Sequence, residues 1–309
     1  MLEFLSSMPG AITLGLIWSV MALGVFISYK VLDIPDLTVD GSFATGGAVC
    51  IIVLAAGGNY YVALLAGLGA GLLCGLVTAL LHTFLGIPPI LAGILTQGAL
   101  WSVNLIILDG SNKAIFVRTT PTFISGIDPN SIWKIAIVVV VLVALLYIFF
   151  GTELGASIRA TGINQRMSRA VGINTKLNTI IGLMLSNGLV ALSGALLAQY
   201  QGSADIKMGM GAIVIGLCAV VIGLAITSKI SQNFLVRMTG VVVGALIYYL
   251  VYQVIVNFKI NPNFLKLFAS IMVAAFLGGP YVYKKYLQKF IRRHKAKGGV
   301  ANDWVKKHM

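Results

Sequence analysis

The chain has 309 residues, of which 58% are apolar and only 10% are charged, and its formal net charge is +13. Soluble domains carry about 25% charged residues, so this composition excludes a soluble enzyme and a soluble binding module. Apolar runs of about 20 residues, long enough to cross a bilayer, recur along almost the whole length. The predicted fold class is an all-α polytopic membrane protein with one membrane domain, residues 1–283, followed by a basic tail, residues 284–309.

Nine transmembrane helices are expected in chain order. The first apolar segment is interpreted as a span rather than a cleaved signal, because its flank holds Glu3, no positive charge and no A-x-A-like site. Cys50, Cys74 and Cys218 lie within apolar runs and are interpreted as small core residues, not as a disulfide framework or a metal site. The nine expected spans cover residues 11–30, 42–57, 60–81, 87–108, 132–150, 177–200, 209–227, 239–257 and 264–283.

The distribution of Lys and Arg predicts the orientation, because cytoplasmic loops carry an excess of both. With the C-terminal tail inside, sixteen of the 22 basic residues fall on the cytoplasmic side. The outer side then holds only Lys113, Arg118, Lys134, Lys207, Lys259 and Lys266. The N-terminus is therefore expected outside, and the loop of residues 151–176 is expected in the cytoplasm.

A polar segment, VLDIPDLTVDGSFATGGAV at residues 31–49, interrupts the apolar pattern after the first span. Carboxylates and hydroxyls beside an apolar bilayer are costly and usually functional. We therefore expect Asp36, Thr38, Asp40 and Ser42 to lie on a translocation pathway. The alternative is that Asp36 and Asp40 only cap the second span. Further pathway candidates are Gln97, Asn104, Met208 and Met210.

Glycine recurs at a four-residue spacing in two of the expected spans. Gly67, Gly71 and Gly75 form one stripe, and Gly240 and Gly244 form another. Small residues at this spacing let helix backbones approach closely. We interpret both stripes as packing surfaces.

The polar, basic stretch GTELGASIRATGINQRMSRAVGINT, residues 151–175, separates two long apolar spans. Its pattern predicts a short helix over 154–160, a turn at 162–164 and a second helical run to residue 171. A loop that merely joins two spans needs little structure. This loop is therefore predicted to be gripped by a partner outside the membrane.

A second polar interruption, QGSADIKMGMGAIVIG at residues 201–216, follows the sixth span and carries Asp205. By the expected orientation it lies on the opposite side from residues 31–49. Four spans, one linking span and four more spans would form an inverted repeat, and interrupted helices at matching places in such halves indicate a transport pathway. The alternative is that both segments are ordinary interfacial loops.

Several motifs are missing from the sequence. There is no Gly-Lys dipeptide and hence no phosphate-binding loop, and the clear mid-span regions lack the acidic residue that an ion-driven carrier usually needs. No histidine has a metal partner at ligand spacing, so we expect no cofactor, no metal and no catalytic site. The basic tail is expected to attract anionic membrane lipid rather than nucleic acid.

The loop of residues 151–176 resembles the permease subunits of bacterial ABC importers, in the branch that includes ribose-type and branched-chain amino-acid permeases. The matching residues are Gly155, Arg159, Ala160, Thr161, Gly162, Asn164, Gly172 and Ile173, followed by Ser186, Ala191, Gly194, Ala195, Gly202, Gly209 and Gly211. The segment DIPDLTVDGSF looks closest to a subgroup whose binding proteins are associated with tryptophan or tyrosine. This chain departs from the family in lacking an acidic residue soon after Gly209 and a Gly-Gly pair at residues 223–224.

The resemblance implies a division of labour in a bacterial cytoplasmic (inner) membrane. Two copies of the chain would form the path, two ABC ATPase subunits would dock underneath, and an extracytoplasmic substrate-binding protein would deliver a small polar solute. ATP hydrolysis would take place on the partner, so the chain itself is not expected to be an enzyme. The expected ATPase-coupling residues are Glu153, Gly155, Arg159, Ala160, Gly162, Asn164, Arg166, Arg169 and Gly172. The alternative function is a self-sufficient secondary transporter or channel without an ATPase.

Overall fold

The computed structural model describes residues 2–116, 120–126, 128, 130–227 and 233–257, with isolated positions at 267, 271, 274 and 278. The chain divides into two compact units, Met1–Phe258 and Lys259–Met309. The expected ninth span, residues 264–283, and the basic tail lie outside the described residues apart from those four positions.

The first half of the first unit contains four apolar helices and one short π-helix: α1 (Leu2–Phe26), η1 (Ile27–Val31), α2 (Val39–Ala55), α3 (Tyr60–Thr83) and α4 (Pro89–Leu108). Local sequence signals explain where two of these helices begin. The Asn59 side chain accepts a hydrogen bond from the backbone N–H of Tyr61 at the start of α3. Proline opens α4, where its missing N–H costs nothing.

The second half contains the helices α5 (Ser131–Gly151), α6 (Glu153–Ile163), α7 (Gln165–Ala170), α8 (Thr175–Gln201), α9 (Ala212–Thr227) and α10 (Phe234–Asn257). Two three-residue strands, β1 (Asn112–Ala114) and β2 (Ser203–Asp205), pair antiparallel. This small sheet is a correction to the all-α expectation. Such short strands carry no alternating pattern and form because the loops that contain them lie side by side.

Each of the eight expected spans up to residue 257 coincides with a helix. Among the residues that the structure describes, six helices are long and apolar enough to cross a membrane. The other two, α2 with 17 residues and α9 with 16, are shorter apolar helices, and each follows a long helix and a non-helical segment. The two predicted interruptions are therefore present within the described part of the chain.

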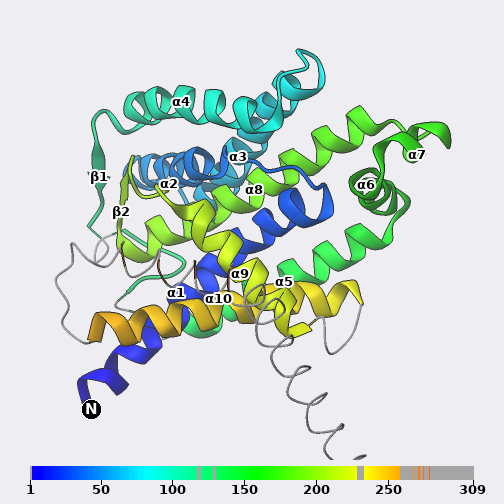
Figure 1. Ribbon diagram of the computed structural model, residues 1–309. Helices are drawn as coiled ribbons and strands as arrows, with labels where there is room; N and C mark the ends of the chain where they lie inside the picture. The colour runs from blue at the N-terminus through cyan, green and yellow to red at the C-terminus, as the bar shows by residue number, and fades with distance from the viewer. Residues whose placement is uncertain are drawn as a thin grey trace, which may run out of the picture. The chain divides into compact units, whose positions relative to one another are not determined.

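Helix α8 runs between the α2–α3 pair and α1 (Figure 1), and it contacts all three. In the apolar 18-residue stretch of α8, 78% of the residues are buried, whereas in the corresponding stretches of α4 and α5 22% are buried. The close approach depends on glycine: a Cβ atom on Gly71 or Gly75 would overlap backbone carbonyls of α8. Gly240 and Gly244 of α10 lie in the same way against α9. The interpretation of both stripes as packing surfaces is confirmed.

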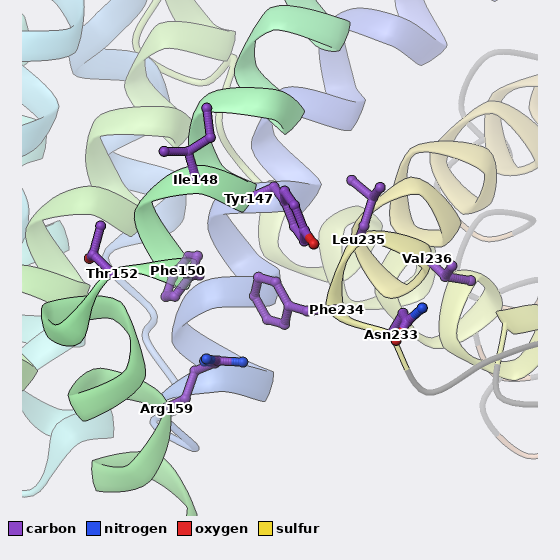
Figure 2. Close-up of a pocket in the computed structure, with 10 residues that line it drawn as sticks. Tyr147, Ile148, Phe150, Thr152, Arg159, Asn233, Phe234, Leu235 and Val236 are labelled. Atoms are coloured by element: carbon purple, nitrogen blue, oxygen red, sulfur yellow. The ribbon is translucent and has the colours of Figure 1, made fainter.

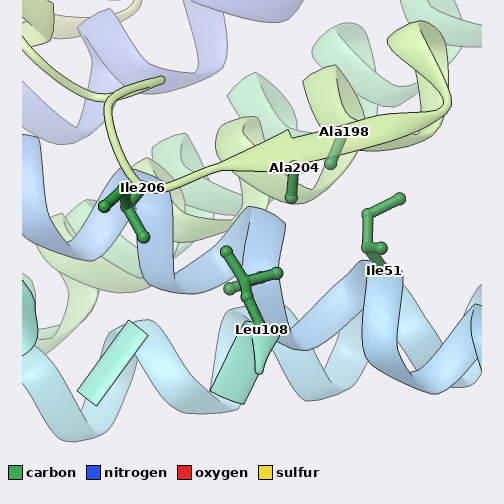
Figure 3. Packing of buried hydrophobic residues seen from close by; sticks show 6 residues of the cluster. Ile51, Leu108, Ala198, Ala204 and Ile206 are labelled. Atoms are coloured by element: carbon green, nitrogen blue, oxygen red, sulfur yellow. The ribbon is translucent and has the colours of Figure 1, made fainter. Parts of the chain in front are cut away.

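A small apolar cluster fixes the segment that leads from α8 to α9. Ala204 and Ile206, in and just after β2, pack on Ile51 of α2 and Leu108 of α4 (Figure 3). Ala48 of α2 and Ala198 of α8 complete the cluster. The second interruption is thus held against the body of the bundle by apolar burial as well as by the β1–β2 pairing.

Cysteine labelling tests the predicted orientation. The three native cysteines are buried, so they should contribute little background labelling. Ser111 and Ala170 are exposed. An impermeant maleimide applied to intact cells should label Ser111→Cys and should reach Ala170→Cys only after the membrane is permeabilised. Labelling in the reverse pattern would overturn the charge-based topology.

Candidate functional site

The loop of residues 151–176 folds into two helices, as expected. The Thr152 hydroxyl caps α6 by accepting from Gly155 N, and the Asn164 side chain caps α7 by accepting from the N–H groups of Arg166 and Met167 at 3.0 and 3.1 Å. The turn between the helices falls at Asn164 alone, because Gly162 belongs to α6. Gly172 has φ +88, a conformation that favours glycine, and it ends the pair.

Helix α6 is fixed to the membrane helices at two points. The Asn178 side chain of α8 donates to the Thr161 hydroxyl at 2.9 Å and accepts from the Ser157 hydroxyl at 3.2 Å. On another side, a Cβ atom on Gly162 would overlap the carbonyl oxygen of Val31, the last residue of η1. A displacement of α6 therefore has to move α8, η1 or both.

Two arginines of this loop contact an aromatic ring and a hydroxyl group. The Arg159 guanidinium lies over the Phe234 ring at 5.5 Å, and the Arg169 Nε donates to the Thr175 hydroxyl at 3.0 Å. Arg166 is exposed. Over the residues that the structure describes, the one ion pair joins Lys134 to Asp128 at 2.7 Å, far from this loop in the sequence.

A row of exposed apolar residues on α6 and α7 was not among the coupling residues predicted from the sequence. Ile163, Met167 and Val171 are 86%, 61% and 71% exposed. Met167 lies on α7 and Val171 is the C-cap of that helix, so their spacing of four residues places these two on one side of α7. Ile163 ends α6, next to the turn at Asn164. The four-residue spacing within an otherwise polar stretch is the signal that could have found them.

The polar residues at the start of α2 form a buried network with α8. One Asp36 carboxylate oxygen accepts from Thr38 N at 2.9 Å, and the other accepts from the Asn187 amide at 2.6 Å. The Asn187 carbonyl oxygen accepts from the Ser42 hydroxyl at 2.7 Å. Asp36, Ser42 and Asn187 are at most 3% exposed. Asn187 was not among the sequence candidates.

A second set of hydrogen bonds joins α2 to α3 and α4. The hydroxyl of Thr38 lies 2.7 Å from that of Thr78, which donates to Thr96 at 3.0 Å. All three are buried. Thr38 thus connects the start of α2 to two neighbouring helices while its backbone N–H is held by Asp36.

Asp40 caps a helix, but not its own. Its two carboxylate oxygens accept from Gly211 N and Ile213 N, each at 2.9 Å, at the start of α9. The alternative interpretation of Asp40, as a cap of the second span, is therefore wrong. Four consecutive N–H groups at a helix start lack partners within the helix, and a carboxylate carried by α2 supplies acceptors for two N–H groups here.

A profile of branched-chain amino acid transport system permease components matches residues 7–277 of the chain. The chain belongs to this family. It is 37% identical over 273 residues to the tyrosine transport system permease protein of Clostridioides difficile, covering 88% of this chain and 91% of that protein. It is 33% identical to an uncharacterised protein of Rickettsia prowazekii, covering 85% and 94%, and 30% identical to the fructose import permease protein of Bifidobacterium longum, covering 77% and 67%.

The family confirms the resemblance to transport permeases that the loop of residues 151–176 indicated. This permease is thus a polytopic membrane subunit of a transport system. Over its described residues it has no group of three or more His, Cys, Asp or Glu side chains that could hold a metal ion. The chemistry that its polar network can perform is hydrogen bonding and helix positioning.

The remaining pathway candidates of the permease lie in different surroundings. Asn104 is buried, and its side-chain oxygen has no hydrogen-bond partner among the described residues. Gln97 and Met208 are half-buried; Gln97 lies beside Gly41, and Met208 packs against Gly47. Met210 is 57% exposed. Gln97 and Met208 thus border α2, whose first turn carries Asp40.

Proposed function

We propose that this permease is the membrane-spanning subunit of an ATP-driven ABC importer in a bacterial cytoplasmic membrane. Two copies form the translocation path, α6 and α7 dock on a cytoplasmic ATPase, and an extracytoplasmic binding protein delivers the cargo. The N-terminus lies outside and the basic tail inside. Family membership supports the permease role, and the positive-inside distribution of Lys and Arg supports the orientation.

The proposal of an ATPase partner rests on the exposed row of Ile163, Met167 and Val171. These side chains lie on a polar, basic stretch outside the apolar bundle, where exposed apolar area costs about 25 cal/mol per Å² unless it is covered. Exposed apolar patches rimmed by polar residues mark protein interaction sites. A helix pair that is fixed to α8 and η1 is also a suitable lever for passing on a partner's motion.

The cargo we propose is an amino acid with an aromatic side chain. One relative, similar along nearly the whole chain, is a tyrosine transport permease. A second relative is a fructose import permease at 30% identity, so a sugar is the competing cargo. Uptake of labelled tyrosine, tryptophan and fructose by the reconstituted complex distinguishes the two classes.

The path is proposed to follow an inverted repeat. Helices α1 to α4 and the chain from α8 onwards form the two halves, with α5 as the link. Each half contains a long helix, a non-helical segment and a short helix, which supports this arrangement. We place Gln97, Met208 and Met210 at the path. Asp36, Thr38, Asp40 and Ser42 hold the backbone that lines it, and the buried Asn104 is a further pathway candidate.

Serine substitutions test the docking surface. Ile163→Ser/Val171→Ser should lower the amount of ATPase that copurifies with the permease by about tenfold, because buried apolar anchors dominate interface energy. Leu154→Ser is the matched control, since Leu154 is also an exposed residue of α6, at 52%, but lies outside the row. If the wild type and both variants copurify with equal amounts of the ATPase, this surface is not part of the interface.

The competing function is a transporter that needs no ATPase. Uptake measured in liposomes that contain only the permease distinguishes the two functions, because an ATP-driven importer should take up no cargo without its ATPase. Uptake by the permease alone, driven by an ion gradient or by the cargo gradient, would overturn the proposed function.

A further inference from the structure

Two adjoining cavities open beside Arg159. They lie at the end of the helix bundle where α6 is found. The first has a volume of about 860 Å³ and lies between η1, α6 and the start of α10. The second has a volume of about 590 Å³ and lies between the end of α5 and the start of α10. Arg159, Asn233 and Phe234 line both. Both volumes fall in the range of small-molecule sites, about 300–1,000 Å³.

The larger cavity is cationic. Lys30, Arg159 and Arg237 line it, and among the described residues Asp33 is the one acidic residue in its lining. Over the described residues none of the three cations forms an ion pair with a carboxylate. The Nε atom of Arg159 is fully buried and has no hydrogen-bond partner there. Because a buried donor without an acceptor is costly, this cavity is suited to an anion.

The smaller cavity has both apolar and polar side chains in its lining. Figure 2 shows Tyr147 of α5 directed toward Phe234 and Leu235 of α10, and Ile148 and Val236 also belong to the lining. Tyr147 is 48% exposed and Ile148 is 65% exposed, and both belong to a helix that is long and apolar enough to span the membrane. An apolar chain could therefore enter this cleft sideways from the bilayer.

Phe234 stands at the junction of the two cavities. Figure 2 shows the Arg159 side chain directed from α6 toward the Phe234 ring, with Phe150 of α5 nearby. A cationic cavity that continues into a cleft next to the membrane matches one kind of molecule, which carries an anionic head and a hydrocarbon tail. Arginine guanidinium groups bind phosphate oxygens with two parallel hydrogen bonds, so the preferred head is a phosphodiester.

We propose that this pair of cavities binds an anionic phospholipid of the cytoplasmic leaflet. Lys30, Arg159 and Arg237 contact the phosphodiester, and an acyl chain lies in the cleft between α5 and α10. The bound lipid fills the space between η1, α6 and α10, the same place where Gly162 of the coupling helix meets Val31. Ile163 of the docking row also lines the larger cavity, so the lipid site adjoins the docking row.

The test uses the purified full-length permease in detergent, without its ATPase, and measures dissociation constants by calorimetry. The probes are dihexanoyl phosphatidylglycerol, dihexanoyl phosphatidylcholine and glycerol 3-phosphate. Phosphatidylglycerol should bind about tenfold more tightly than either of the others, because the first control lacks net charge and the second lacks chains. Binding that is equally tight for phosphatidylcholine would overturn the anion site, and equally tight binding of glycerol 3-phosphate would overturn the lipid.

Variants locate the site. Lys30→Gln and Arg237→Gln should each weaken phosphatidylglycerol binding by about fivefold, whereas Arg237→Lys, which keeps the charge, should retain most of it. Leu235→Asn should weaken the lipid but not glycerol 3-phosphate. Arg166→Gln is the matched control, because it removes the same charge from an exposed residue of α7 outside the cavity.

Wild-type affinity in both glutamine variants would refute the proposed site. The absence of saturable lipid binding, together with loss of the ATPase from these two variants, would instead assign the cations to the ATPase interface. Neither outcome depends on transport, so the lipid site can fail while the importer function stands.

Discussion

Gly162→Ala should uncouple ATP hydrolysis from uptake. A Cβ atom at residue 162 would overlap the carbonyl oxygen of Val31, a backbone atom that cannot rotate away. Helix α6 would have to lift from η1, and overpacking of this kind costs about 1–3 kcal/mol. A difference of 1.4 kcal/mol changes a population about tenfold. We therefore expect a fall of about that size in the cargo imported per ATP hydrolysed by reconstituted vesicles.

Gly151→Ala is the matched control, because it makes the same chemical change at the last residue of α5, just before α6. A Cβ atom there would meet nothing within 4 Å, so this variant should transport as the wild type does. The double change Arg159→Ala/Gly162→Ala should be at least as severe, since it also removes the contact with Phe234. Full coupling in Gly162→Ala would show that α6 does not transmit motion through η1.

The helices of this permease could be predicted because hydropathy alone decides which segments cross a bilayer. The two short helices in the loop of residues 151–176 were also predictable, because caps are local: Asn164 holds the N–H groups two and three residues after it. Even the residues at which glycine is needed for packing followed from a four-residue spacing.

The partners of the polar side chains could not be predicted. Asp36 meets Asn187 across 151 residues of sequence, and Asp40 meets Gly211 across 171. A carboxylate near a helix start indicates a cap, but which helix it caps depends on packing between α2 and α9. In the same way the strands β1 and β2 exist because distant loops are brought together, and three residues carry no pattern to reveal that.

These partners form a continuous physical path from the coupling loop to the start of α9. Asn178 holds α6, and Asn187, nine residues later on α8, holds the start of α2; at 1.5 Å per residue they are about 13 Å apart along the helix. From there the first turn of α2 reaches α9 through Asp40. Such a chain of hydrogen bonds transmits a displacement only if its elements have two arrangements, and a change at its far end therefore tests it.

Asp40→Ala should lower uptake by about tenfold or more while the permease still inserts and is purified in normal amount. The substitution leaves two N–H groups at the start of α9 without acceptors, and hydrogen bonds to charged groups contribute about 1.5–3 kcal/mol each. It also removes a negative charge that the positive end of the helix dipole favours. The start of α9 should therefore loosen, together with the preceding segment that carries Met208 and Met210.

Hydrogen exchange of the backbone amides at residues 208–213 measures this loosening directly, and it should rise in Asp40→Ala and rise less in Asp40→Asn, which keeps one acceptor. Asp128→Ala is the control, because Asp128 also accepts from a backbone N–H but lies in the loop before α5. Lost uptake with unchanged exchange would mean that Asp40 contacts the cargo itself rather than holding α9. Full uptake with unchanged exchange would remove Asp40 from the pathway, leaving Gln97 and the methionines as the positions to examine.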